Sequence, residues 1–238
     1  MAQVINTNVA SLFGQQALNK SSSGLQTAMQ RLSSGLRINS AKDDPTGMVT
    51  AAGYDSQMRG ANQAMRNAND GISTAQINDG YHQQVLENLQ RIREIAVQLG
   101  GTASGSEFTA LAAENTRILG LAGNTGNVVV NSNGGVLAGT GTKAALTGTG
   151  AITVIDADIT LVTTARATYG ADMATFSSVV ANLGVQSVNT AAAYSRVMDT
   201  DYAVETTNMI RNQILQQAGT AMLAQANQIP NSVLSLLR

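Results

Sequence analysis

One long run of regularly spaced side chains constrains this chain more than any other feature. Its members alternate in steps of four and three: Ile155, Ile159, Val162, Arg166, Tyr169, Met173, Phe176, Val180 and Leu183. The β-branched residues of 151–162 favour a strand by composition, but strand alternation cannot produce these steps over such a distance. The spacing therefore predicts one helix from about residue 155 to 194, roughly 60 Å long at 1.5 Å per residue. A helix of that length predicts an elongated molecule.

Both ends of the chain also show helical spacing. Near the N-terminus Leu18, Leu25 and Leu32 recur every seven residues, which is typical of a coiled-coil stripe. Near the C-terminus the apolar stripe consists of Leu215, Ala218, Met222, Ala226, Ile229, Val233 and Leu236. We expect Pro230 to kink or end this helix near Ile229. The methionines of these patterns, Met29, Met173 and Met222, are interpreted as core-filling residues.

The two ends are unusually poor in charge. Residues 1–30 contain a single charged side chain, Lys20, and residues 212–237 contain none; charged residues make up 12% of the whole chain. An amphipathic helix in water normally carries charges on its outer face. We therefore expect the polar faces of these helices to contact other protein molecules as well.

The middle of the chain contains the residues that predict helix boundaries, turns and loops. Asp44 followed by Pro45 predicts a helix start, and Gly100 with Gly101 predicts a helix end, while Ser106 is a candidate cap for a shorter helix. Asn133-Gly134 between two apolar runs predicts a β-hairpin. Twelve of the 23 glycines lie between residues 100 and 150, and we expect a Gly/Thr-rich loop over 139–150. Asp43 and Asp44 are interpreted as capping residues rather than paired catalytic carboxylates.

Several functions are disfavoured. The chain has no Cys and one His, so disulfides, thiolate metal sites and multi-histidine metal sites are excluded, and we expect no metal or cofactor. His82 is interpreted as a surface or interface residue. A net charge of −1 gives no support for nucleic-acid binding. The start lacks the basic and apolar regions of a cleavable signal, and no run of 18 apolar residues predicts a membrane span.

Long motifs at both ends resemble those of the bacterial flagellins. They are residues 1–8 (MAQVINTN), 31–44 (RLSSGLRINSAKDD), 66–73 (RNANDGIS) and 89–98 (LQRIREIAVQ), followed by 195–203 (SRVMDTDYA), 213–218 (QILQQA), 225–227 (QAN) and 233–237 (VLSLL). The resemblance covers about residues 1–120 and 150–238. The chain is thus similar to a short flagellin that lacks the outer variable domains.

The resemblance implies a fold and a function. The fold is mainly α, an elongated bundle of long antiparallel helices with coiled-coil termini and a small β-hairpin region. Residues 1–44 together with 200–238 would form an inner coiled-coil polymerisation domain. Residues 45–199 would form a helical rod domain, with a short β and Gly/Thr-rich segment at about 125–150. The polymerisation core would comprise Leu18, Leu25, Leu32, Leu215, Met222, Ile229, Val233 and Leu236, and Asp199 and Asp201 would lie at the joint between the two layers.

The implied function is a non-enzymatic structural subunit that polymerises into the flagellar filament for swimming motility. Its implied partners are further copies of itself, an export chaperone, the filament cap, hook-associated proteins and a host Toll-like receptor. Its location would be extracellular, on the flagellum, after type III export. Arg91, Ile95 and Glu114 match positions by which similar flagellins engage the receptor. Arg91 and Glu114 could instead pair with each other or contact the next subunit, and subunit contact is favoured as the primary role of this surface.

Three other functions are weighed against this one. A hook–filament junction protein would share the helical ends but would cap rather than propagate. A metallopeptidase of the kind that some flagellins carry requires His-Glu-x-x-His, which this chain lacks. A membrane-active amphipathic helix at 215–237 would normally carry Lys or Arg on its polar face, and this segment has none.

Overall fold

The computed structural model describes residues 8–126, 128–129 and 135–228. The chain divides into two compact units, Met1–Gly53 with Ala192–Arg238, and Tyr54–Ala191. The first is called the terminal unit below and the second the central unit. Two helices run through the boundary between the units, α2 (Pro45–Gln98) and α4 (Ile152–Met198).

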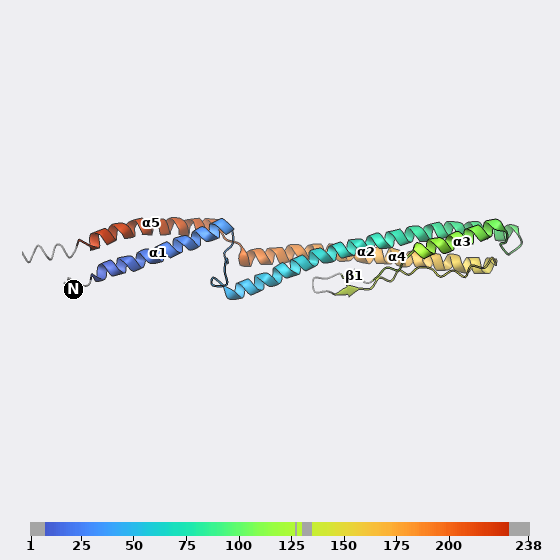
Figure 1. Ribbon diagram of the computed structural model, residues 1–238, viewed down its shortest axis with the longest axis horizontal. Helices are drawn as coiled ribbons and strands as arrows, with labels where there is room; N and C mark the ends of the chain where they lie inside the picture. Colours follow the sequence, from blue (N-terminus) through green and yellow to red (C-terminus); the bar gives the residue numbers. More distant parts are fainter. Residues whose placement is uncertain (1–7, 127, 130–134, 229–238) are drawn as a thin grey trace, which may run out of the picture. The chain divides into compact units, whose positions relative to one another are not determined.

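The terminal unit is built on α1 (Val9–Ser34) and α5 (Tyr202–Ala226), which lie side by side (Figure 1). A side-chain hydrogen bond caps the start of each helix. The Asn8 side chain accepts a hydrogen bond from the Ser11 amide, and the Asp201 side chain accepts from the amides of Ala203 and Val204. α1 ends at Ser34 and is capped by Gly35, whose φ of 72° is the left-handed conformation that glycine adopts without strain.

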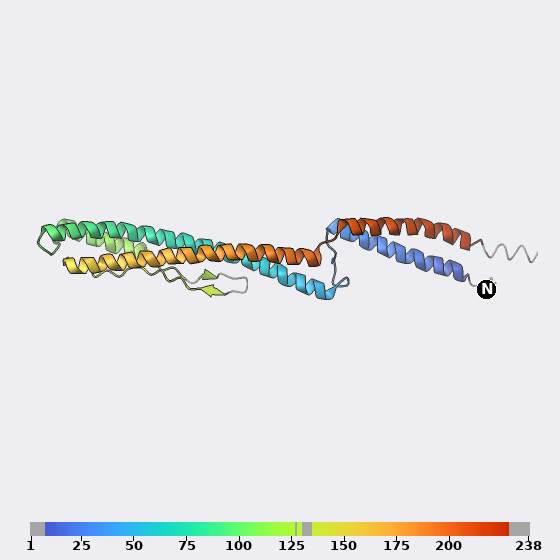
Figure 2. The same ribbon diagram turned by 180° about the vertical axis from the view of Figure 1, so that it is seen from behind.

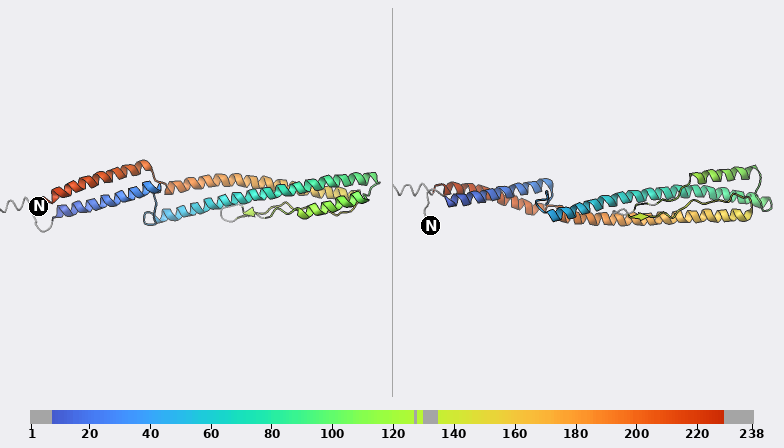
Figure 3. Two further views of the ribbon diagram at one scale, coloured as in Figure 1. Left: turned by 45° about the horizontal axis from the view of Figure 1, so that its top comes forward. Right: turned by 60° about the horizontal axis from the view of Figure 1, so that its bottom comes forward.

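The central unit contains most of α2 and α4 with the shorter α3 (Ser106–Leu121). Figures 2 and 3 show these helices from further sides. α2 starts as predicted, because Pro45 is its first residue and Asp44 Oδ1 accepts from the Gly47 amide at 2.9 Å. Its end before Gly100 and Gly101 is also confirmed, and both glycines have positive φ. The predicted cap of α3 is wrong: Gly105 occupies the cap position without a side-chain hydrogen bond, and Ser106 is the first helical residue.

The long predicted helix is confirmed as α4, which begins at Ile152, directly after Ala151 in an isolated β-bridge with Thr102. Every seventh residue of its stripe is buried: Ile155, Val162, Tyr169, Phe176 and Leu183. Arg166 interrupts the apolar character without disturbing the packing, because its Nε donates to Asp79 Oδ1 on α2 at 2.8 Å. The main core of the unit joins Ile155, Val162 and Tyr169 of this stripe to Val85, Leu89 and Ile92 of α2 and to Ile118 of α3. Leu183 packs separately against Ala61 and Ala64 of α2.

The predicted hairpin strands are β1 (Val128–Val129) and β2 (Val136–Leu137). They pair antiparallel, with Val128 opposite Leu137 and Val129 opposite Val136. The proposed turn residues Asn133 and Gly134 lie outside the described residues.

Residues 138–150, expected to be a loop, are named the strap here. They have no regular secondary structure, yet buried side chains of α2 and α4 hold their backbone in place. Asp172 accepts from the amides of Thr140 and Gly141 at 3.0 and 2.7 Å, and Asp158 accepts from the Thr147 amide at 3.0 Å. The strap is therefore a docked segment of the central unit.

The interpretation of His82 as a surface or interface residue is wrong. Its side chain is 0% exposed and lies beside the ring of Tyr169, with the ring centroids 5.2 Å apart. Nε2 accepts from the Ala144 amide of the strap at 3.0 Å, so the other nitrogen, Nδ1, carries the proton and donates to the Asn78 carbonyl at 2.7 Å. His82 is a structural residue that joins α2 to the strap.

Candidate functional site

Contacts between α1 and α5 bring the two ends of the chain together. Asn8 Nδ2 donates to the Ala226 carbonyl at 2.9 Å, and Ser11 Oγ donates to Asn227 Oδ1 at 3.0 Å. At the opposite end of the pair, Arg31 Nη1 lies 3.6 Å from Glu205 Oε2. Residue numbers rise along one helix as they fall along the other, so the helices are antiparallel.

Small residues line the surface where the two helices meet. A Cβ added at Gly24 would lie 2.9 Å from Asn212 Nδ2, and one added at Gly219 would lie 3.0 Å from the Leu18 side chain. Ser21, Ala28 and Ala226 are buried. The helices therefore approach closely, and their large apolar side chains are not all enclosed between them.

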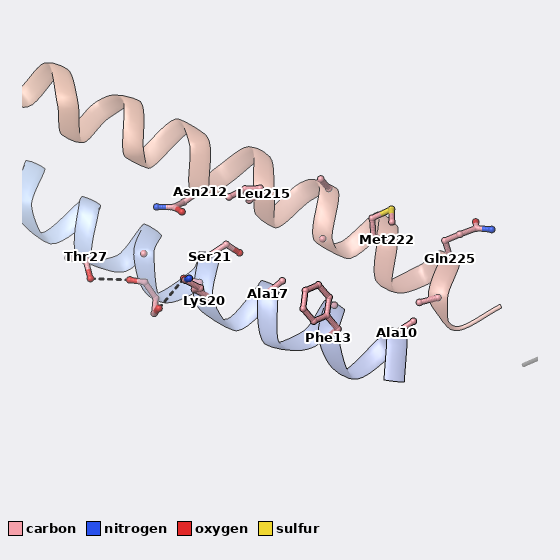
Figure 4. Close-up of a pocket in the computed structure, with 16 residues that line it drawn as sticks. Ala10, Phe13, Ala17, Lys20, Ser21, Thr27, Asn212, Leu215, Met222 and Gln225 are labelled. Carbon is pink, nitrogen blue, oxygen red and sulfur yellow. Dashed lines mark hydrogen bonds between the residues drawn. The ribbon is translucent and has the colours of Figure 1, made fainter. Parts of the chain in front are cut away.

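A groove of about 960 Å³ runs between α1 and α5 (Figure 4). Among the residues that line it, Lys20 is the only one with a charged side chain. Phe13, Ala17 and Ser21 of α1 face the opening together with Leu215 of α5. An apolar groove of this kind favours burial against another apolar surface.

Large apolar side chains are also exposed along both helices. Phe13 is 73% exposed and Met222 is 68% exposed. Eight others of this kind are Val9, Leu12, Met29, Tyr202, Val204, Ile210, Ile214 and Leu215. So many exposed large apolar side chains on one pair of helices favour an interaction site.

The residues predicted to form a polymerisation core are distributed unevenly. Leu18, Leu25 and Leu32 are half-buried on α1, whereas Leu215 and Met222 are exposed on α5. Ile229, Val233, Leu236 and the kink expected at Pro230 lie outside the described residues. The interpretation of Met29 and Met222 as core-filling residues is wrong for the single chain, because both are exposed; Met173 packs against the central core.

Sequence reasoning overlooked the charged pair of this surface, Arg31 and Glu205. Glu205 is only 7% exposed, and its partner Arg31 is the one cation that forms an ion pair with it in the described part of the chain. The sequence feature that could have identified this pair is the rarity of charge in these helices, which makes each charged residue a candidate for a specific contact. Asp201 is a helix cap, and Asp199 forms a backbone bridge with Leu36 within the same unit.

The candidate receptor-contact residues lie in the central unit. Arg91 on α2 donates through Nε to Glu107 on α3 at 2.8 Å and through Nη1 to Glu94 at 3.0 Å. Glu114 on α3 pairs with Arg117, whose hydrogen bond lowers the pKa of Glu114. The alternative that Arg91 and Glu114 pair with each other is therefore wrong. Ile95 is 7% exposed and belongs to the core, while Arg91 and Glu114 have half-exposed side chains.

The capping interpretation is confirmed for Asp44, which accepts from the Gly47 amide of α2, whereas Asp43 bonds to the turn that precedes the helix. Asp43 Oδ2 accepts from the Ser40 hydroxyl and from the amides of Ser40 and Asn39. These hydrogen bonds, with that from the Ser40 hydroxyl first, lower the pKa of Asp43.

No group of three His, Cys, Asp or Glu side chains that could hold a metal ion occurs within the ranges that the structure describes. In the same ranges, no helix is both long enough and apolar enough to cross a membrane.

These observations define a class of protein: an α-helical subunit whose paired chain ends present charge-poor, apolar surface for association with other proteins. Comparison with known families makes the class specific. Residues 5–142 match the bacterial flagellin N-terminal helical region, and residues 152–237 match the bacterial flagellin C-terminal helical region.

Individual relatives agree with this match. The chain is 36% identical over 313 residues to a flagellin of Xenorhabdus nematophila, with all of both chains covered. It is 35% identical over 285 residues to the flagellar filament 33 kDa core protein of Treponema phagedenis, covering 99% of this chain and 100% of the relative. A flagellin of Salmonella muenchen is 55% identical over 120 residues, which are 50% of this chain and 24% of the relative.

The chain belongs to the bacterial flagellin family. It is a structural subunit of the flagellar filament and not an enzyme, and as such it is a protein of the extracellular flagellum. The hook–filament junction alternative gains no support from these matches.

Proposed function

We propose that this subunit polymerises by burying the exposed apolar side chains of α1 and α5 against other copies of the same chain. The observation that carries the proposal is the exposure of Phe13, Ile214 and Met222 on helices that hold few charges. Burying a large apolar side chain contributes about 1.5–3 kcal/mol. A contact between different patches on successive copies does not close, and it therefore produces a helical filament.

In this proposal residues 1–44 and 200–238 form the inner polymerisation domain, and residues 45–199 form the helical rod domain. Leu18, Leu25, Leu32, Leu215, Met222, Ile229, Val233 and Leu236 make up its core. The exposure of Leu215 and Met222 in the single chain supports contact with neighbouring copies, because it leaves their side chains available.

A charge placed on this surface tests the proposal. We expect I214E to prevent filament growth, because a carboxylate buried between subunits would lose its hydration without gaining a partner. The matched control is Q76E, which places the same charge on an exposed position of α2 in the central unit. Seeded polymerisation is followed by light scattering and electron microscopy; I214E filaments as long and as abundant as those of Q76E would contradict the proposal.

The remaining partners follow from the family resemblance. We propose that an export chaperone holds the subunit before type III export, that a distal cap guides its addition to the filament, and that hook-associated proteins join the filament at its ends. The apolar surface of α1 and α5 supports a chaperone step, since it would otherwise be exposed to other unassembled copies.

We also propose that a host Toll-like receptor contacts the face carrying Arg91 and Glu114. Support comes from their half-exposed side chains on neighbouring helices, which Asn88 Nδ2 and Asn115 Oδ1 connect at 2.8 Å. Because Ile95 is buried, we expect it to support this face from beneath, while Arg91 and Glu114 make most of the receptor contact. Loss of reporter-cell signalling by R91A/E114A, with retained polymerisation, would separate this role from subunit contact.

A further inference from the structure

The surface between α1 and α5 repeats every seven residues. On α5 the residues that contact α1 include Glu205, Asn212, Gly219 and Ala226, each separated from the next by seven positions. Such a repeat presents equivalent positions again after one heptad, a shift of about 10.5 Å along the helix. The side-chain repeat alone therefore allows competing registers that keep the same face of α5 against α1, and backbone hydrogen bonds from Thr200 to Gly35 and from Arg37 to Met198 hold the adjoining ends of the helices.

Most contacts of this surface discriminate weakly between those registers. They involve small residues, the steric fits of Asn212 against Gly24 and of Leu18 against Gly219, and the partly exposed hydrogen bonds of Asn8 and Ser11. The ion pair differs. A shift of one heptad in one direction places Glu205 opposite Gly24, and a shift in the other direction places it beyond Ser34, the last residue of α1. Either shift separates Glu205 from Arg31.

The burial of Glu205 makes that separation costly. Its carboxylate is 10% exposed as a side chain, and in the part of the chain that the structure describes it has one cationic partner, Arg31. A buried ion pair adds little net stability, because desolvation offsets the attraction, but a buried charge that loses its partner is strongly unfavourable. The pair thus penalises the shifted registers more than it stabilises the native one.

We propose that Arg31 and Glu205 are positioning residues that select the register of α1 against α5. A shift of one heptad would displace the exposed apolar side chains of α5, such as Leu215 and Met222, relative to those of α1, such as Phe13. The register is a property of the single chain; its consequence for filament growth rests on the proposed function.

The absence of Cys allows the register to be measured by disulfide formation in the full-length protein. The pair S11C/N227C reports the native register, since Ser11 Oγ and Asn227 Oδ1 lie 3.0 Å apart. The pair S11C/T220C reports a shift of one heptad, because Thr220 is seven residues before Asn227. Oxidation is performed on dilute and on polymerised protein, and intrachain disulfides are distinguished from interchain ones by mobility on a denaturing gel.

With Arg31 and Glu205 intact we expect the native pair to form at least about tenfold more disulfide than the shifted pair, because the Cα separation of a disulfide cannot exceed about 7 Å. In E205Q the ratio of native to shifted disulfide should fall by about tenfold, because no buried charge then loses its partner in the shifted register. The charge exchange R31E/E205R should restore it, which a merely space-filling role would not allow. The control D55N removes the exposed pair with Arg59 and should leave the ratio unchanged.

An unchanged ratio in E205Q would overturn the proposal. So would loss of both disulfides in E205Q, because the pair would then hold the helices together without selecting a register. The two proposals can fail separately. If the disulfide ratio changes as expected but the protein with the intact ion pair forms no filaments, the proposed function is contradicted and the register assignment stands.

Discussion

At the scale of single residues, buried acceptors of the central unit hold the strap by its backbone amides. Asp172 is the strongest example, because it accepts from the Thr140 amide, the Thr140 hydroxyl and the Gly141 amide. Burial raises its pKa, but these hydrogen bonds together outweigh burial and leave the pKa below its usual value. Burial also raises the pKa of Tyr169 to about 12, so its phenol stays protonated and donates to the Gly123 carbonyl.

We expect D172N to destabilise the central unit by about 2 kcal/mol. The amide nitrogen that replaces one carboxylate oxygen cannot accept hydrogen bonds from the backbone amides of the strap. A carboxyl whose folded pKa is depressed stabilises the fold above its unfolded pKa of about 3.9, and that contribution is lost as pH falls through the folded value. The difference in unfolding free energy between the two proteins should therefore shrink below about pH 4.

Urea denaturation from pH 3 to pH 7, at about one-unit intervals, measures both effects. D55N serves as the control, because its carboxylate pairs with Arg59 on the exposed surface and should contribute about 0–1 kcal/mol. A D172N effect that stays constant across this range would show that the ionised form of Asp172 is not what holds the strap.

At the scale of elements, the sequence predicted what is encoded by local spacing. α4 was predicted from its period, since Val162 and Phe176 recur on one face whatever they pack against. The hairpin strands and the start of α2 at Pro45 follow from equally local chemistry. The strap could not be predicted, because its order depends on partners distant in sequence: Ala144 bonds to His82, and Gly141 bonds to Asp172.

The candidate site could be predicted only in part, because some of its features depend on local sequence and others on contacts between distant segments. The lack of charge at the chain ends identified both helices as an interaction surface, but the exposure of Met222 depends on how α1 and α5 pack. The pairing of Arg31 with Glu205 likewise depends on the tertiary alignment of segments far apart in the chain.

The close approach of the strap to α4 gives a prediction for a matched pair of glycines. A Cβ at Gly141 would collide with the Tyr169 ring and with the Thr125 side chain, whereas a Cβ at Gly126 would meet nothing within 4 Å. We expect G141A to destabilise the central unit by about 1–3 kcal/mol and to speed amide exchange at Ala144. G126A should leave both near their original values; equal effects of the two substitutions would contradict a tightly docked strap.

At the scale of the whole chain, the two units place different demands on folding. The terminal unit joins residues separated by as many as 218 positions, as in the Asn8–Ala226 hydrogen bond. The central unit has its own apolar core, formed by residues of α2, α3 and α4. Helices with few enclosed apolar contacts gain little from tertiary packing, which supplies most helix stability. Assembly can supply the burial that α1 and α5 lack in the single chain.

This difference predicts where backbone amides exchange with solvent. In dilute subunits we expect the amides of α1 and α5 to exchange about 100-fold faster than those around Val85–Ile92, because opening the terminal helices exposes little additional apolar surface. In filaments the same amides should become protected, since subunit contacts bury their exposed side chains. Hydrogen–deuterium exchange with mass spectrometry on both states measures this change, and the central core is the internal control. Equal protection of α1 and α5 before and after polymerisation would contradict assembly through these helices.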